Sequence, residues 1–227
     1  MANDNRVSIT RLIAIPAVIT LLVTFLRLEG ELNHWGAPWF NSSAGGGAAI
    51  VGISWLPIIF GPWFAFKLIK AGSGFMSASR AWGYLGLAFI LLVASGIIVG
   101  VGISKQMMAL AIVGFLAMVL AAILPIRAWG ALARTLIAYA FSARLPVLVV
   151  MFFAMRGNGG AGWGTHYDAV DPGMAHLPFA QKFLLLAFLP QMTLWIAWTV
   201  IVGFLAGLIA VALVRRGKPA AEAAAKA

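Results

Sequence analysis

The stretch 81–126 reads AWGYLGLAFILLVASGIIVGVGISKQMMALAIVGFLAMVLAAILPI, and its single charged residue is Lys105. Two apolar runs, about 81–103 and 107–126, flank this lysine, and each has roughly the 20 residues that an α-helix needs to cross a bilayer core. Because lipid offers no partners to backbone N–H and C=O groups, such runs are stable there as helices. The stretch therefore predicts a transmembrane helical hairpin.

The rest of the chain repeats this pattern, with further apolar runs over about 12–26, 48–66, 136–155 and part of 183–214. The chain is 63% hydrophobic and 10% charged, whereas soluble domains are about 25% charged. The sequence predicts an all-α, polytopic transmembrane helical bundle with about six spans and Gly-rich outer loops. We expect one transmembrane domain over 1–216, followed by a flexible Ala-rich cytoplasmic tail over 217–227.

The distribution of the basic residues predicts how the bundle is oriented. If the N-terminus is cytoplasmic, the inner basic residues are Arg6, Arg11, Lys67, Lys70, Arg80, Arg127, Arg134, Arg215, Arg216, Lys218 and Lys226. The outer basic residues are then Arg27, Lys105, Arg156 and Lys182. This asymmetry follows the positive-inside rule and predicts that both termini are cytoplasmic, in a bacterial inner membrane. The net charge of +10 thus indicates orientation and contact with membrane lipids, and we expect no nucleic-acid partner.

Several kinds of chemistry are excluded by what the spans lack. The chain has no cysteine, and none of its carboxylates or histidines falls inside a predicted span. Carboxylate proton relays and haem ligation between helices both need such residues there. His166 and His176, with acidic residues between them, are the nearest approach to a metal site, but hydrogen bonding within an outer loop is the favoured interpretation. The sequence therefore predicts no catalytic residue, no metal and no cofactor.

Arg144 is a charged residue that does fall inside a predicted span. If its helix ends near Arg156, the guanidinium lies about 18 Å deep, close to the bilayer midplane. A charge there costs at least about 2.5 kcal/mol, which marks it as a functional candidate. In the alternative interpretation, 128–143 is an interfacial helix, Pro146 shortens the span, and Arg144 extends to the cytoplasmic surface.

Prolines indicate a second feature of the predicted site. Pro57 and Pro62 fall in the second apolar run, and Pro190 precedes Gln191 in the last one. Interrupted helices near the midplane are where many transporters bind their substrates, although prolines also produce simple kinks. The predicted ligand-binding residues are Arg144, Tyr139, Gln191, Trp163, His166 and Asp168.

Two function classes follow from these observations. The first is a non-catalytic subunit or accessory component of a membrane assembly, because the predicted spans lack acids and histidines and contain small-residue helix faces. These faces, Gly96-x3-Gly100 and Gly203-x3-Gly207, have the spacing of closely packed helices, and packing within the molecule is their favoured interpretation. Its partner would be another membrane protein or a second copy of the chain. The second is a carrier for a small solute or a lipid head group, with Arg144 binding an anionic group. An enzyme using the His166 loop is the weakest interpretation.

Overall fold

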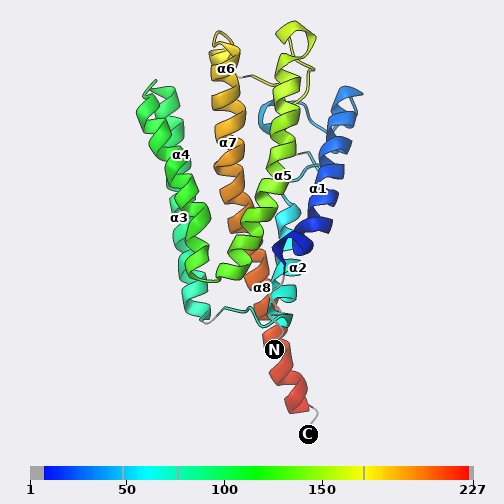
Figure 1. Cartoon of the computed structure of the whole chain (residues 1–227), viewed down its shortest axis with the longest axis vertical. Coiled ribbons are helices and arrows are strands. Elements are labelled where there is room, and N and C mark those ends of the chain that lie inside the picture. Colours follow the sequence, from blue (N-terminus) through cyan, green and yellow to red (C-terminus); the bar gives the residue numbers. More distant parts are fainter. Residues whose placement is uncertain (1–7, 48, 76, 171, 225–227) are drawn as a thin grey trace.

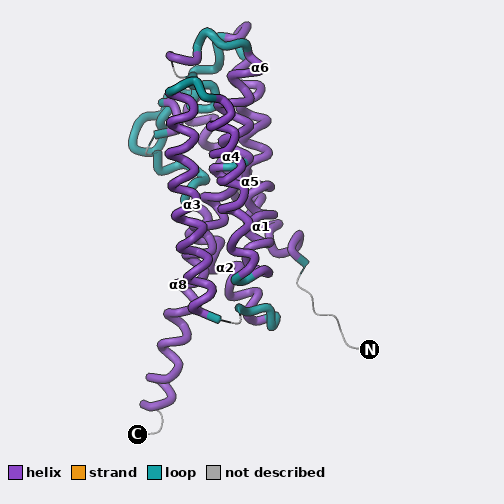
Figure 2. Tube along the Cα trace, turned by 90° about the vertical axis from the view of Figure 1, so that its left-hand side faces the viewer, coloured by secondary structure: helices purple, strands orange, loops and turns teal. Residues whose placement is uncertain are grey.

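The chain folds into a bundle of long helices that run between two ends of the molecule (Figures 1 and 2). The computed structural model describes residues 8–47, 49–75, 77–170 and 172–224, with side chains as far as 214. Within these ranges the structure contains helices and loops and no strand, which confirms the all-α prediction for this part of the chain.

Five helices make up most of the bundle: α1 (Ile9–Leu32), α3 (Ala78–Ser104), α4 (Met108–Ile123), α5 (Gly130–Arg156) and α8 (Leu194–Ala224). The remaining elements are η1 (Ala44–Gly46), α2 (Leu56–Lys70), η2 (Leu124–Arg127), η3 (Asn158–Gly160), η4 (Pro172–Met174), α6 (Phe179–Lys182), η5 (Phe183–Phe188) and α7 (Leu189–Met192). α1 begins in the lower half of Figure 1, and α2 and α8 end at its lower end. The two long loops lie at the upper end.

Five helical segments are long and apolar enough to cross a membrane: Ile9–Leu32, Ala78–Ser104, Met108–Arg127, Gly130–Arg156 and Phe179–Val214. Large apolar side chains cover their outer surfaces; Ile90 and Leu213, for example, are 65% and 64% exposed. Such surfaces are suited to lipid, and the chain therefore has the build of an integral membrane protein. The predicted hairpin over 81–126 is present as α3, α4 and η2.

The second predicted span differs from a full-length helix. Helix α2 begins only at Leu56, and the described residues before it, 49–55, are not helical. Pro57 occupies the first turn of α2, where a proline lacks only an N–H that would be unbonded anyway. Tryptophan side chains bond the backbone of the non-helical segment: Trp55 Nε1 donates to the Ile50 carbonyl at 3.0 Å, and Trp198 Nε1 donates to the Ser54 carbonyl at 2.9 Å.

The last apolar run is continuous in space but irregular in its backbone. The apolar run over 183–214 is too long for one straight span, and its length predicts an outer amphipathic piece up to about Leu189, then a span from about Gln191. Instead, the π-helical segment η5 leads directly into α7, and Thr193, with φ of −123°, separates α7 from α8. Pro190 cannot donate a backbone hydrogen bond, which is a physical reason for irregular winding at this point.

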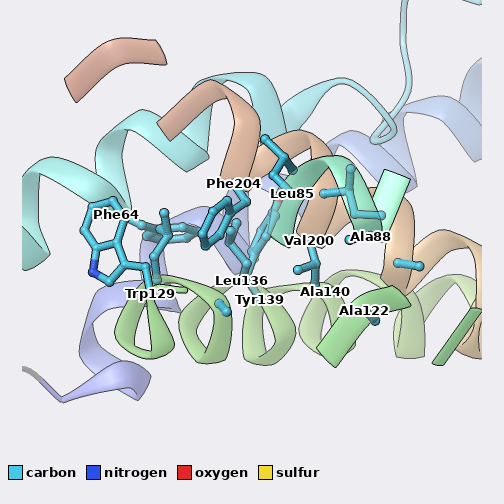
Figure 3. Close-up of a cluster of buried hydrophobic side chains, with 14 of the residues drawn as sticks. Phe64, Leu85, Ala88, Ala122, Trp129, Leu136, Tyr139, Ala140, Val200 and Phe204 are labelled. Atoms are coloured by element: carbon cyan, nitrogen blue, oxygen red, sulfur yellow. The ribbon is translucent and has the colours of Figure 1, made fainter. Parts of the chain in front are cut away.

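Helices α2, α5 and α8 meet around a core of aromatic and small side chains (Figure 3). Gly61 of α2 lies directly against the backbone of Gly203 in α8, which leaves no room for a side chain at Gly61, and a side chain at Gly203 would meet Leu136 of α5. Phe64, Tyr139 and Phe204 fill the space beside this crossing and are almost completely buried. The predicted Gly203-x3-Gly207 face is therefore packed inside the molecule.

The proposed tail over 217–227 is helical as far as Ala224, as the continuation of α8. Residues 225–227 lie outside the described part of the chain.

Candidate functional site

A cavity of about 330 Å³ lies between α1, α5 and the last helical run, and Ala44 and Gly45 of the loop after α1 also line it. Ile53 and Ser54 from the segment before α2, and His166 from the loop after α5, also line it. The cavity owes its space to the short α2, because a loop takes the place of a helix above Leu56. Interrupted helices create binding sites in transporters in the same way.

Arg144 projects into this cavity from the middle of α5. Its side chain is almost entirely enclosed, with 3% of the residue exposed, and its guanidinium lies 4.7 Å from the centre of the Trp195 ring. Its Nε has no hydrogen-bond partner among the described residues. Helix α5 runs without interruption from Gly130, so the alternative of a separate interfacial helix over 128–143 does not describe the fold.

Gln191 lines the same cavity from the last helical run. Its Nε2 donates only to the Met151 sulfur, at 3.6 Å, and its Oε1 accepts no hydrogen bond from a described residue. Buried polar atoms without partners cost roughly 1–3 kcal/mol each, and a bound polar ligand can compensate them. The cavity therefore presents an unsatisfied donor on Arg144 beside an unsatisfied polar group on Gln191.

The electrostatic character of the cavity is positive. Arg144 supplies the uncompensated charge among the described lining residues, because Arg27 is paired with Glu31 at 2.8 Å and no described carboxylate lines the cavity. The N-terminal end of α2 lies directly after the lining residues Ile53 and Ser54, and that end of a helix carries a partial positive charge. Nothing among the lining residues neutralises Arg144, so this arrangement favours an anion.

A network of charged groups joins both upper loops to α1. Glu31 accepts hydrogen bonds from Arg27 Nε at 2.8 Å and from the His166 backbone N–H at 2.8 Å, and its carboxylate lies 2.7 Å from His166 Nδ1. Arg27 also donates to the carbonyls of Asn41 at 3.1 Å and Gly46 at 2.6 Å. One buried carboxylate thereby fixes the loop after α1 and the loop after α5 in place above the cavity.

The loop residues at this network are also buried. Tyr167 donates a hydrogen bond to the Thr24 carbonyl at 3.2 Å, and its ring lies 3.9 Å from that of His166. Burial lowers the pKa of His166, although its hydrogen bond to Glu31 acts in the opposite direction. Burial also raises the pKa of Tyr167. A neutral His166 ring and a protonated Tyr167 are therefore favoured at neutral pH.

The predicted site residues divide into two groups. The structure brings Arg144, Gln191 and His166 together around the cavity. Tyr139 lies deeper in the core and hydrogen-bonds Thr20 at 2.8 Å.

The other two predicted residues stabilise the loop after α5. Trp163 lies against Gly157. Asp168 accepts backbone hydrogen bonds from Gly164 and Thr165, both at 2.9 Å, so its carboxylate is used within the loop.

Sequence reasoning missed Arg27, Glu31 and Trp195. The sequence did contain a pattern that predicts the contact between Arg27 and Glu31. They have opposite charges and are four residues apart, which is the spacing of an ion pair on a helix. No sequence pattern distinguishes Trp195, because a tryptophan in an apolar run can equally face lipid, the core or a cavity.

The described residues contain no group of three His, Asp or Glu side chains that could hold a metal ion. His176 is exposed, and Asp171, the other acidic residue of the suggested cluster, lies outside the described residues.

Known proteins offer no guide to this cavity. Comparisons of the chain with protein-family models, with curated proteins and with solved structures find no match. The function must therefore be argued from the cavity and the surfaces of the bundle.

Proposed function

We propose that the protein is a membrane carrier that binds a small anion, either a free solute or the anionic head group of a lipid, at Arg144. The observation that carries this proposal is the enclosed guanidinium, which faces a cavity without a carboxylate. A buried charge without a partner is costly, and a bound anion would remove much of that cost. The ligand is small, because about 330 Å³ is at the low end for small-molecule pockets.

Membrane orientation forms part of the proposal. The helix directions bring Arg11, Lys67, Arg80 and Arg127 to the end of the bundle where α8 also ends. The positive-inside rule makes that end cytoplasmic. The cavity then lies toward the outer side of a bacterial cytoplasmic membrane. Six crossings result if the segment before α2 and α2 itself are counted together as the second.

Binding is tested by thermal unfolding and calorimetry of the detergent-purified protein. Inorganic phosphate, a short-chain carboxylate and a short-chain phosphatidylglycerol separate a free solute from a lipid head group, and choline serves as the cation control. We expect at least one anion to stabilise the wild type and to lose its effect in Arg144→Met. Arg156→Gln is the matched control, since Arg156 is on the same helix but outside the cavity, near Phe152 and Phe179.

Transport is tested separately, by measuring uptake into proteoliposomes of whichever anion binds to the purified protein. Uptake that requires Arg144 but not Arg156 supports a carrier. Stabilisation by choline, or equal anion effects in the wild type and Arg144→Met, contradicts the proposal.

A second candidate function is supported by the outer face of α3. Gly83, Gly86, Gly96 and Gly100 all have open space where a side chain would be, whereas Gly102 of the same helix lies against Ala111. In lipid, small residues on an open helix face allow another helix to approach closely. We propose that this face binds another membrane protein or a second copy of the chain, which would make the protein a subunit of a membrane assembly.

The assembly proposal is tested by purification in mild detergent and measurement of the complex mass. The double variant Gly96→Leu with Gly100→Leu should release the partner, while Ala14→Leu, on the exposed surface of α1, should not. A wild type that is a monodisperse monomer from native membrane counts against this function.

A further inference from the structure

Two arginines define a second basic site at the opposite end of the bundle from the Arg144 cavity. Arg80 is in the first turn of α3, and Arg127 ends η2. Both line a hollow of about 260 Å³, together with Ser73 and the beginning of α5 at Gly130. The elements that form this hollow meet at the lower end of the bundle (Figure 1).

Neither arginine is neutralised within the described part of the chain. The ion pairs found there join Arg27 and His166 to Glu31, at the other end of the bundle. Arg80 and Arg127 are exposed and form no side-chain hydrogen bond or ion pair with a described residue. The first turn of α5 also borders the hollow and receives no side-chain cap, so its N–H groups add to the positive potential.

An apolar groove continues from this basic hollow along the membrane-facing surface. It has a volume of about 550 Å³ and lies between α3 and α4. Leu87, Leu91 and Leu120 line it, with Tyr84 nearer its lower end. Ile126 and Arg127 line both the groove and the hollow, so the apolar and basic parts are contiguous.

We propose that this composite site binds an anionic phospholipid. The phosphate contacts Arg80 and Arg127, and one acyl chain lies along the groove between α3 and α4. Charge complementarity selects this occupant, because two unpaired cations favour a net negative head group over a zwitterionic one. The adjoining apolar groove favours a lipid over a soluble anion, which would leave the groove unfilled. The site does not depend on the Arg144 cavity or on the carrier function.

Native mass spectrometry of the delipidated, detergent-purified protein tests this site. Phosphatidylglycerol and phosphatidylcholine with identical acyl chains are the probes. We expect phosphatidylglycerol to bind more tightly, and Arg80→Gln with Arg127→Gln to weaken its binding about 25-fold, since each arginine contributes roughly a fivefold factor. Phosphatidylcholine binding should weaken by a smaller factor, because its choline group offsets the charge of the phosphate that the arginines contact.

Two further variants make the test specific. Lys67→Gln with Lys70→Gln removes the same charge at the same end of the bundle but outside the site, and should change phosphatidylglycerol binding by less than about threefold. Leu120→Trp fills the groove and should weaken binding of both lipids. Equal binding of the two lipids by the wild type, or an equal loss in the lysine variant, overturns the proposal. Because both arginines are exposed, unchanged melting temperatures are expected and verify that the variants fold.

Discussion

Individual residues around the Arg144 cavity differ in how completely their polar atoms are paired. Arg144 and Gln191 keep unpaired polar atoms inside the cavity, while the neighbouring Glu31 has its carboxylate fully engaged. The unpaired atoms reduce stability and the engaged ones contribute to it. This contrast is the basis on which we propose a ligand for the Arg144 cavity.

Replacement of Arg144 by methionine should stabilise the ligand-free protein. Removal of a buried unpaired charge in favour of an apolar side chain of similar length is expected to contribute about 1–4 kcal/mol, less the cation–π contact with Trp195. The measurement is thermal unfolding in detergent without added anions. A lower melting temperature than that of the wild type would instead show that the guanidinium is a structural element of the core.

Acidification should destabilise the loops above the cavity through His166. The pKa of its ring is lowered in the folded state, so the unfolded chain binds a proton first as the pH falls. The contribution of neutral His166 is fully present above its unfolded pKa of about 6.5 and is lost as the pH falls through the lower folded value. Melting temperatures between pH 8 and 5 should fall for the wild type. His166→Gln should show a flatter profile, and an equal slope would contradict this assignment.

At the scale of elements, glycines determine which helix faces touch each other. Gly61 and Gly203 allow α2 and α8 to cross at backbone contact, and Gly102 and Gly114 do the same for α3 and α4. The glycines on the outer face of α3 have no such neighbour. The same residue type thus permits close helix packing on one face and leaves open space on another.

Gly61→Ala should destabilise the bundle, because its new methyl group would overlap the backbone of Gly203. Overpacking of this kind costs about 1–3 kcal/mol or more. Gly83→Ala is the matched control, since it also replaces a helical glycine but in open space, and it should be neutral or stabilising by up to about 1 kcal/mol. Unfolding in detergent compares the two variants. Equal melting temperatures would mean that the α2–α8 crossing is looser than it is in the structure.

At the scale of the whole molecule, the two ends of the bundle have different surfaces. The upper end carries the ordered loops, the Arg27–Glu31–His166 network and the Arg144 cavity. The lower end carries exposed arginines beside an apolar groove. In the proposed orientation, the Arg144 cavity faces the outer side of the membrane and the proposed lipid site faces the inner side.

Single cysteines at the two ends of α3 test the proposed orientation, because the natural chain contains no cysteine. Ser104→Cys and Ser79→Cys are matched, since both replace an exposed serine near an end of the same helix. A membrane-impermeant maleimide should label Cys at 104 in intact cells and label Cys at 79 only after permeabilisation. The reverse labelling pattern would show that the bundle has the opposite orientation in the membrane.

The sequence alone determined that the chain is helical and where most of the apolar segments lie. The run predicted over 81–103 is α3, Ala78–Ser104, and the run over 107–126 is α4 with η2. These features are predictable because length and apolarity are local properties, and because lipid requires a chain to satisfy its backbone within each helix. The pairing of Arg27 with Glu31 was also present in the sequence, as a spacing of four residues.

Only the tertiary structure decided what the polar residues do. A midspan arginine has the same sequence signature whether it faces lipid head groups or a cavity; the packing of α1, α5 and α8 enclosed Arg144. The short α2 likewise depends on Trp198, which bonds the Ser54 carbonyl from a helix 144 positions away in the chain. Contacts between distant segments set the burial and the partners of each polar atom, and these are properties that no local pattern encodes.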